Sequence, residues 1–173
     1  MKKLAKSILV LLLSLSMCAC SSSSSVSKKT SSQKKTEEKQ KEKIYTTGET
    51  VTYTKNNKNL VKFTVDSVQA TDERNEFEES NPAQVIIIKY SYENLNDDDE
   101  VYFSSINFKV VDEGGNVCES YPASLNVYPQ QAPKGTKSEG EEAYGLKQQS
   151  SKVKFIVDFD FTGTKATYEL PIQ

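Results

Sequence analysis

The residues with the clearest chemistry near the start of the chain are two closely spaced cysteines, Cys18 and Cys20. They follow a lysine-rich start and an apolar run over residues 8–17, which is too short to span a bilayer comfortably. A cysteine that closes such a run after a small residue is typical of a bacterial lipoprotein signal. The chemistry expected here is a thioether bond from the cysteine sulfur to a diacylglycerol.

Two cysteines compete for that lipid. Cys20 follows the small Ala19 and has Met17 as an acceptable apolar residue three positions back, so we predict lipidation at Cys20. Cys18 is the alternative, because Leu15 stands three residues before it, although the large Met17 precedes it directly. An ordinary cleaved secretory peptide is the simpler interpretation, and the serine run after the cysteines disfavours it.

Lipidation of Cys20 would separate a signal peptide from the mature chain and would place the mature chain at a membrane. Residues 1–19 are then a signal peptide that is removed, and the membrane partner is lipid bound through the N-terminal diacylglyceryl cysteine. Acyl chains on that residue bury enough methylene groups for stable attachment. We therefore expect a protein anchored in the cell membrane on its extracytoplasmic face.

The third cysteine, Cys118, is expected to be structural. It would be the only free thiol of the mature chain, so it cannot form an intrachain disulfide. The chain has no histidine, which removes Cys–His and Ser–His nucleophile pairs and histidine-containing zinc sites. A small apolar strand residue is the interpretation that remains for Cys118.

Carboxylates are the other residues that could do chemistry. The run Asp97, Asp98, Asp99 and Glu100 offers hard oxygens for Ca²⁺, but the glycine and distal glutamate of an EF-hand loop are missing. A solvated turn is the favoured interpretation, and calcium binding stays open.

Two further groups of carboxylates are weaker candidates. Four glutamates surround Arg74 in the segment 72–82, and Asp158 and Asp160 lie two apart, which predicts one outer strand face. A glycosidase needs two carboxylates opposed across a cleft. We therefore predict no catalytic residue, no cofactor and no metal site, with a carboxylate- or metal-dependent enzyme as the least favoured alternative.

The segment after the lipid site predicts a tether. Residues 20–43 hold the lipidated cysteine and then almost only polar residues, with Val26 as the single aliphatic after it, so this stretch is expected to be disordered. Residues 21–43 carry seven lysines and three glutamates, a net charge of +4, whereas residues 44–173 carry a net charge of −9. An acidic domain argues against nucleic-acid binding, and a basic tether suits an anionic lipid surface.

The sequence of residues 44–173 has the pattern of an all-β domain. Short runs alternate apolar and polar residues and are separated by turn residues. The glycine pair in residues 112–116 is the strongest hairpin signal. The apolar positions expected on successive strands are Val51 and Tyr53; Val61, Phe63 and Val65; Ile86, Ile88, Tyr90 and Tyr92; Ile106, Phe108 and Val110; Tyr144 and Leu146; Phe155, Val157, Phe159 and Phe161; and Ala166, Tyr168, Leu170 and Ile172. Residues 117–121 are expected to form the strand that returns from the hairpin.

This pattern predicts an immunoglobulin-like β-sandwich of about 7–9 antiparallel strands. No amphipathic helix of normal length interrupts the strands, so parallel α/β layouts are excluded. Pro122, Pro129 and Pro133 fall between strands, where they discourage edge-to-edge pairing.

Four segments carry a resemblance: VIIIKYSYENLNDD, FKVVDEGGNV, APKGTK and the closing VKFIVDF…ATYEL. With the lipobox and the Ser/Lys tether, they resemble the uncharacterised Gram-positive lipoproteins that have a telokin-like, immunoglobulin-like domain. The matching positions are Glu93-Asn94, Asp112 with Gly114, and Pro133 with Gly135, within residues 48–172. Residues 142–146 depart from the family's Gly-x-x-x-Phe strand, so the strand register there is open. The resemblance implies the immunoglobulin-like fold and brings no agreed activity.

Tyrosines near strand ends supply the candidate recognition surface. Tyr102, Tyr121 and Tyr128 fall in or near loops, where binding modules carry their contacts, although tyrosine is also a common half-buried sheet residue. We expect a non-enzymatic binding or adhesion module for an envelope polymer or a protein. The alternative is an accessory or regulatory lipoprotein that docks onto a membrane protein complex.

Overall fold

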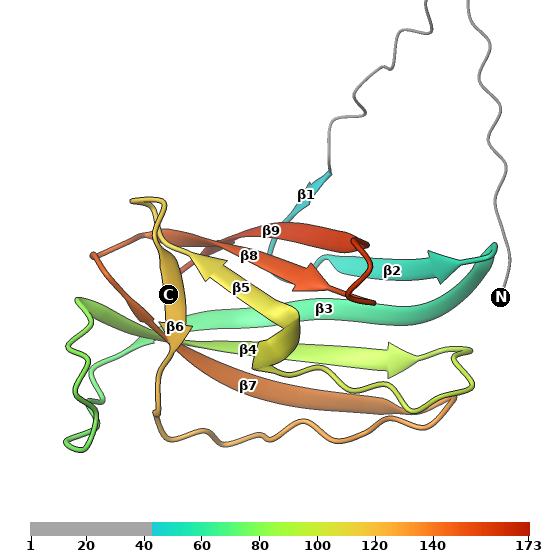
Figure 1. The fold of residues 1–173 in the computed structure, drawn as a ribbon, viewed down its shortest axis with the longest axis horizontal. Helices are drawn as coiled ribbons and strands as arrows, with labels where there is room; N and C mark the ends of the chain where they lie inside the picture. The colour runs from blue at the N-terminus through green and yellow to red at the C-terminus, as the bar shows by residue number, and fades with distance from the viewer. Residues whose placement is uncertain (1–42) are drawn as a thin grey trace, which may run out of the picture. The chain divides into compact units, whose positions relative to one another are not determined.

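The described part of the chain, residues 43–173 of a computed structural model, consists of strands joined by loops (Figure 1). The predicted signal peptide, the tether up to residue 42 and both lipidation candidates, Cys20 and Cys18, lie outside these residues. No helix in the described part is long and apolar enough to cross a membrane. The elements are β1 (Ile44–Tyr45), β2 (Thr50–Lys55), β3 (Lys58–Thr71), β4 (Gln84–Asn94), the 3-10 helix η1 (Ser105–Asn107), β5 (Phe108–Val111), β6 (Val117–Ser120), β7 (Lys137–Leu146), β8 (Lys152–Asp158) and β9 (Lys165–Pro171).

The nine strands form one continuous sheet in the order β1-β9-β8-β5-β6-β7-β4-β3-β2. The prediction of an all-β domain is therefore confirmed. The short β6 pairs with β5 on one side and β7 on the other, so it joins the β1-β9-β8-β5 layer to the β7-β4-β3-β2 layer (Figure 1). One pairing differs from the all-antiparallel expectation, because β1 runs parallel to β9.

The two layers also meet away from β6, at the C-terminus of the chain. The backbone N–H of Gln173 donates to the carbonyl of Val68 at 3.0 Å, and the N–H of Ala70 donates to the carbonyl of Gln173 at 2.9 Å. The hydroxyl of Tyr168 reaches the carbonyl of Phe63 at 3.1 Å. These bonds hold β9 and its C-terminal extension against β3.

Aromatic side chains fill the space between the layers, and Phe63 is the ring that contacts most of them. Its neighbours come from four other strands and from the segments after β4 and β8; they are Tyr90, Phe103, Phe108, Phe155, Phe159 and Tyr168. Phe63, Tyr90, Phe155 and Tyr168 are fully buried. Aromatic rings bury large apolar areas and gain from tilted and edge-on contacts, so this cluster is the main source of cohesion between the layers.

The predicted hairpin at residues 112–116 is confirmed between β5 and β6. Gly115 has a φ of 81°, a left-handed conformation that glycine adopts without strain. The carboxylate of Asp112 accepts hydrogen bonds from the backbone and side-chain nitrogens of Asn116 at 2.9 and 3.0 Å. Burial raises the pKa of Asp112, but these hydrogen bonds outweigh it and hold the pKa below its usual value.

Two of the predicted core residues lie on the surface. Ile106 was expected on the strand of Phe108, but it is 74% exposed on η1, where the side chain of Asn107 accepts a hydrogen bond from the N–H of Ser104 and favours a helical turn. Phe161 was expected to continue β8, but it is 63% exposed in a turn. The strand ends at Asp158, whose carboxylate accepts the backbone N–H of Phe161 at 2.8 Å.

The strand around Tyr144 is longer than the sequence indicated. β7 runs from Lys137 to Leu146 and pairs with β4 along ten residues, from Glu93↔Lys137 to Gln84↔Leu146. Its first half, KSEGE, has no apolar side chain, so hydrophobic periodicity does not detect it. The ladder with β4 settles the register, and Tyr144 and Leu146 point inward as predicted.

Candidate functional site

Two long connections run side by side along one side of the domain. The first joins β4 to β5 through residues 95–107, and the second joins β6 to β7 through residues 121–136 (Figure 1). They pair as a short antiparallel bridge, in which the N–H and carbonyl of Val101 exchange hydrogen bonds with Ala132 at 3.0 and 2.8 Å. The two loops therefore act as one surface.

Asn94 fixes both loops to the sheet. This residue ends β4 and is fully buried. Its side-chain nitrogen donates to the carbonyls of Asp99 at 2.9 Å and Ala132 at 3.0 Å, and its side-chain oxygen accepts the N–H of Asp97 at 2.9 Å. One buried amide thus orders a turn in each loop, which is the property a rigid binding surface needs.

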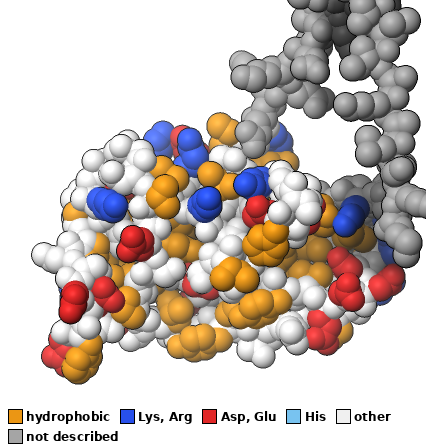
Figure 2. Space-filling model, in the orientation of Figure 1, with side chains coloured by type: hydrophobic (Ala, Val, Ile, Leu, Met, Phe, Trp, Pro, Cys, Tyr) orange, Lys and Arg blue, Asp and Glu red, His pale blue; other side chains and the backbone are white. Residues whose placement is uncertain are grey.

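Two aromatic side chains are exposed on this pair of loops. Tyr102 is 45% exposed and Tyr128 is 65% exposed. Tyr102 borders an open hollow of about 480 Å³ whose other lining residues are Glu100, Pro129, Gln130 and Gln131. Figure 2 shows hydrophobic side chains gathered over these loops, below the strands. We call Tyr102, Tyr128 and the hollow the tyrosine surface.

The third predicted recognition residue, Tyr121, is structural. It is 6% exposed, and its hydroxyl accepts the backbone N–H of Asn75 at 2.8 Å. The side chain of Asn75 also donates to the carbonyl of Pro122. Tyr121 therefore anchors the β3–β4 loop to the β6–β7 loop, and the prediction that it offers a recognition contact is wrong.

The floor of the tyrosine surface is held by two inward side chains of β4, Tyr90 and Tyr92. The hydroxyl of Tyr90 donates to the carbonyl of Phe103, and the hydroxyl of Tyr92 donates to the carbonyl of Gln130. Gly140 on β7 leaves the space for this arrangement, because a Cβ atom there would lie 2.6 Å from the Tyr90 hydroxyl oxygen and 3.1 Å from Pro129 Cβ.

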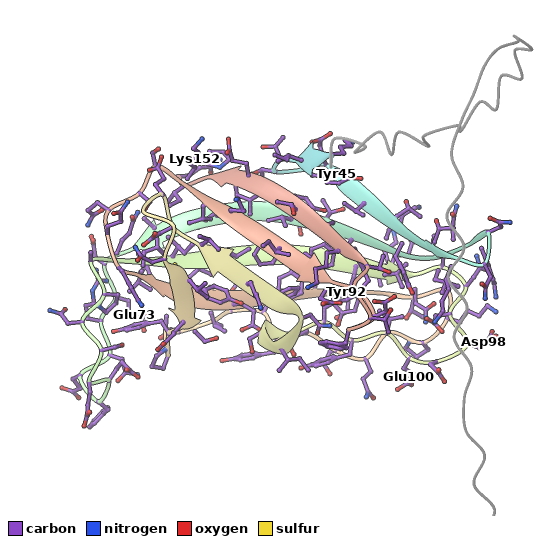
Figure 3. All side chains as sticks on the ribbon, turned by 45° about the horizontal axis from the view of Figure 1, so that its top comes forward. Tyr45, Glu73, Tyr92, Asp98, Glu100 and Lys152 are labelled. Atoms are coloured by element: carbon purple, nitrogen blue, oxygen red, sulfur yellow. The ribbon has the colours of Figure 1, made fainter. Side chains whose placement is uncertain are left out.

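The chemistry that this surface offers is stacking with directional hydrogen bonding. The exposed faces of Tyr102 and Tyr128 provide flat apolar contact, and their hydroxyls can donate and accept. The amides of Gln130 and Gln131 and the carboxylate of Glu100 line the hollow beside them. In Figure 3, Glu100 lies on the surface of the domain with its side chain toward solvent. Such a surface suits a sugar or peptide that lies flat across it.

A partly buried carboxylate on β7, Glu142, supports the end of the first loop. It accepts the backbone N–H of Ser105 at 3.0 Å, at the start of η1. Burial raises the pKa of Glu142 above its usual value of 4.5, against the opposing effect of that hydrogen bond. The nearby hydroxyl of Tyr144 is buried and has no hydrogen-bond partner among the described residues. The sequence pattern gave no sign that Glu142 points inward.

Glu142→Gln should change how stability depends on pH. A carboxyl whose pKa is higher in the folded state binds a proton more tightly there, so its contribution to stability is fully present below 4.5 and is lost as the pH rises through the folded value. The amide keeps an acceptor for Ser105 and carries no charge. We expect denaturant unfolding to give a variant that matches the wild type at acidic pH and exceeds it at neutral pH. Glu119→Gln, at an exposed position on β6, is the control, and identical pH profiles for all three proteins would contradict the assignment.

The acidic run of residues 97–100 lies at the edge of this site and is used locally. The carboxylate of Asp98 pairs with Lys134 at 2.7 Å, which lowers the pKa of Asp98 and ties the two loops together once more. The carboxylate of Asp97 accepts the N–H of Asp99. Within residues 43–173, no group of three or more acidic, histidine or cysteine side chains is arranged to hold a metal ion. Figure 3 places Asp98 and Glu100 near one corner of the domain.

The second acidic cluster forms a separate loop between β3 and β4. The carboxylate of Glu73 accepts hydrogen bonds from the N–H and hydroxyl of Ser124 at 2.9 and 2.8 Å, which fastens the loop's base. Arg74 donates to the carbonyls of Thr71 and Glu73 rather than to a carboxylate. Phe77 is 88% exposed. We call residues 72–80 the acidic loop.

The sequence predicted that Asp158 and Asp160 share one outer strand face, and this prediction is wrong. Asp158 ends β8, and Asp160 lies in the turn beyond it. Partial burial raises the pKa of Asp160, but hydrogen bonds from Thr162 and Thr164 outweigh it and lower the pKa well below its usual value. Its carboxylate also accepts the Tyr53 hydroxyl at 3.1 Å. Both carboxylates therefore shape the β8–β9 turn.

Cys118 occupies an inward position on β6. It is buried, and burial together with the charge of Asp112 raises the pKa of its thiol to about 11. A thiol with such a pKa is almost entirely protonated near neutrality and is a poor nucleophile. This environment agrees with the structural role expected from the sequence.

Comparison with known proteins finds similar folds and gives no information on activity. No protein-family model and no curated protein matches the chain. A secreted protein of Mycobacterium tuberculosis, MPT63, is 12% identical and is matched over 75% of this chain and 98% of its own, with a TM-score of 0.53. The yjhA protein of Bacillus subtilis is 16% identical over 75% of this chain and 100% of its own, with a TM-score of 0.51. At these identities the likeness concerns the fold alone.

Proposed function

We propose that this chain is a lipid-anchored extracytoplasmic lipoprotein whose β domain is a non-enzymatic binding module. The anchor is the diacylglyceryl group on Cys20, and residues 21–43 are the tether between this anchor and the domain. The ligand is an envelope polymer or protein segment that lies across the tyrosine surface. The fold similarity to a secreted mycobacterial protein supports an extracytoplasmic location.

The observation that carries the binding proposal is the rigid exposure of Tyr102 and Tyr128. Two aromatic side chains on loops are costly to expose and are enriched where proteins make specific contacts. Here the loops beneath them are ordered before any ligand arrives, through Asn94 and the Val101–Ala132 bridge. Binding to such a surface loses little conformational entropy.

Tyr102→Ala combined with Tyr128→Ala should weaken ligand capture about tenfold or more, because each exposed aromatic contact at the centre of an interface contributes 1 kcal/mol or more. The measurement is saturation binding of the lipoprotein to purified wall fragments and to surface proteins of the producing cell. Val117→Ser is the control, since Val117 is also exposed but lies on β6, away from the loops. Equal loss in the control, or unchanged capture in the double variant, would reject the tyrosine surface.

The alternative function, an accessory lipoprotein of a membrane protein complex, is favoured by Phe77. This ring stands 88% exposed beside Glu76 and Glu78, on a loop whose base is fastened through Asn75 and Glu73. An apolar ring among carboxylates suits a protein partner with an apolar notch and a basic rim. In-cell crosslinking that captures one membrane protein in the wild type and loses it in Phe77→Ala would favour this function over the first.

We also propose that the domain belongs to the telokin-like, immunoglobulin-like lipoprotein family. Asn94 stands at the Glu-Asn pair of the family pattern, and Gly135, the glycine of its Pro-x-Gly motif, adopts a positive φ of 80°. In this view β6 is the strand at which an immunoglobulin-like pair of sheets has become continuous. Family membership would be tested by solved structures of chains that carry the same three motifs.

A further inference from the structure

The outer face of β5, β8 and β9 is basic on an acidic domain. Strand alternation places Lys109, Lys152, Lys154 and Lys165 on this face, opposite the buried positions of the same strands. Two carboxylates there are paired, Glu169 with Lys152 at 3.0 Å and Asp158 with Lys165 at 3.4 Å, and a third, Glu113, lines a hollow at one end of the face beside Lys152 and Lys154. Lys109 and Lys154 form no ion pair among the described residues, and the four lysines exceed the three carboxylates by one charge. Figure 2 shows lysines gathered over these strands and carboxylates gathered at the corners.

The same face also carries most of the exposed aliphatic surface. Four of the seven large apolar side chains exposed in the described chain lie on it or at its rim: Ile44, Ile106, Val117 and Phe161. Ile106 and Phe161 line one hollow of about 240 Å³ together with Ile156, Lys109 and Lys165. Val117 pairs with the outward Val111, and Ile44 pairs with Thr167 on β9. We call this set the lysine–isoleucine face.

Phe161 is held out from this face by the turn that carries it. Its φ is 55°, a left-handed conformation that is unusual for an aromatic residue. Hydrogen bonds to Asp158 and Asp160 fix the turn around it. An exposed ring kept in a strained conformation is an outlier from which a functional role can be inferred.

The position of β1 indicates what covers this face. The described chain begins at Lys43, immediately before β1, and β1 pairs with β9 at the edge of the lysine–isoleucine face. Residues 1–42 precede that point, and the lipid of the proposed function lies among them. Figure 3 shows Tyr45 and Lys152 in the same outer layer. The first described strand therefore lies at the edge of the lysine–isoleucine face.

We propose that the lysine–isoleucine face docks on the anionic leaflet in which the chain is anchored. Lys109 and Lys154 contact lipid headgroups, and Phe161, Ile106 and Ile44 enter the interfacial region, as basic and apolar residues do together at membrane surfaces. This inference rests on the proposed lipid anchor and goes beyond it.

The absence of tryptophan from the chain allows a direct test. Phe161→Trp places a single indole on the face, and Tyr128→Trp places one on the tyrosine surface as the matched control. The lipidated protein is reconstituted into vesicles of phosphatidylglycerol and phosphatidylcholine. We expect the indole at position 161 to shift to shorter wavelength and to be quenched by lipids brominated near the headgroup, and the indole at position 128 to be unaffected.

Charge reversal separates docking from anchoring. Adding Lys109→Glu and Lys154→Glu to Phe161→Trp should lower the docked-to-undocked ratio by about 25-fold or more, since each lysine at an anionic leaflet contributes about fivefold. Vesicles of phosphatidylcholine alone should give the same loss. Flotation with the vesicles must be unchanged in every case, because it reports the lipid anchor.

Three results would overturn the proposal. Protein that floats while the indole at position 161 stays unquenched would reject docking and leave the anchor intact. Protein that does not float would reject the anchor on which docking rests. A spectral shift with soluble polyphosphate but not with vesicles would assign the lysine–isoleucine face to an anionic polymer instead.

Discussion

Asn94→Ala should destabilise the domain by about 3 kcal/mol and lower its midpoint of thermal unfolding by about 10 °C. The buried amide makes three hydrogen bonds, to Asp97, Asp99 and Ala132, and each is worth about 1 kcal/mol when its partner can otherwise reach no water. Hydrogen exchange should rise in both loops of the tyrosine surface, since both lose the side chain that orders them. Denaturant unfolding and exchange mass spectrometry measure the two effects.

Asn96→Ala is the matched control for that change. Its side-chain nitrogen donates to a single carbonyl, that of Asn59, on the exposed side of the neighbouring turn. Its removal should cost less than about 1 kcal/mol and leave exchange in residues 121–136 unaltered. If the two alanine variants unfold at the same denaturant concentration, Asn94 is not the residue that joins the loops.

Phe63→Ala should cost about 3–5 kcal/mol, the largest loss expected from any single substitution in this core. Phe63 is fully buried on β3 and touches rings from both layers, including Phe155 on β8 and Tyr168 on β9. Removing it leaves a cavity where the two layers meet, and the surrounding strands can collapse only in part. Equilibrium unfolding in urea measures the loss.

Phe77→Ala makes the same chemical change at a surface position and serves as the control. Because Phe77 is 88% exposed, its removal should change the unfolding free energy by no more than about 0.5 kcal/mol. A loss at Phe63 as small as the one at Phe77 would mean that the layers are held together by something other than the aromatic cluster.

Strand alternation was enough to predict the all-β class and most of the inward positions, but not the continuous strand order or the parallel β1–β9 pair. Phe63, Ile88, Phe155 and Tyr168 occupy the inward positions expected of them, and the β5–β6 hairpin follows from Gly115. Ile106 and Phe161 were wrongly predicted to point inward. Hydrophobic periodicity does not show where the side chain of an asparagine or aspartate ends a strand. The signals that could have found both ends are Asn107 and Asp158, which bond to nearby backbone N–H groups.

The candidate site was predictable only in part. Tyr102 and Tyr128 were expected in loops and are exposed there. Tyr121 was also expected near a loop, but it is buried, and its hydroxyl accepts the backbone N–H of Asn75. The pairing of the two loops depends on Asn94, whose three bonds reach residues up to 38 positions away. Contacts at that separation are set by topology, which local patterns do not encode.

The most direct test of the account is the mass of the N-terminal peptide of the protein purified from its own cells. We predict a peptide that begins at Cys20 and carries a diacylglyceryl group on its sulfur, with the protein recovered in the membrane fraction. Cys20→Ala should then accumulate as an unprocessed precursor or leave the membrane. A chain that still begins with Met1, carries no acyl group and is found in the cytosol would contradict the proposal of a lipid-anchored binding module.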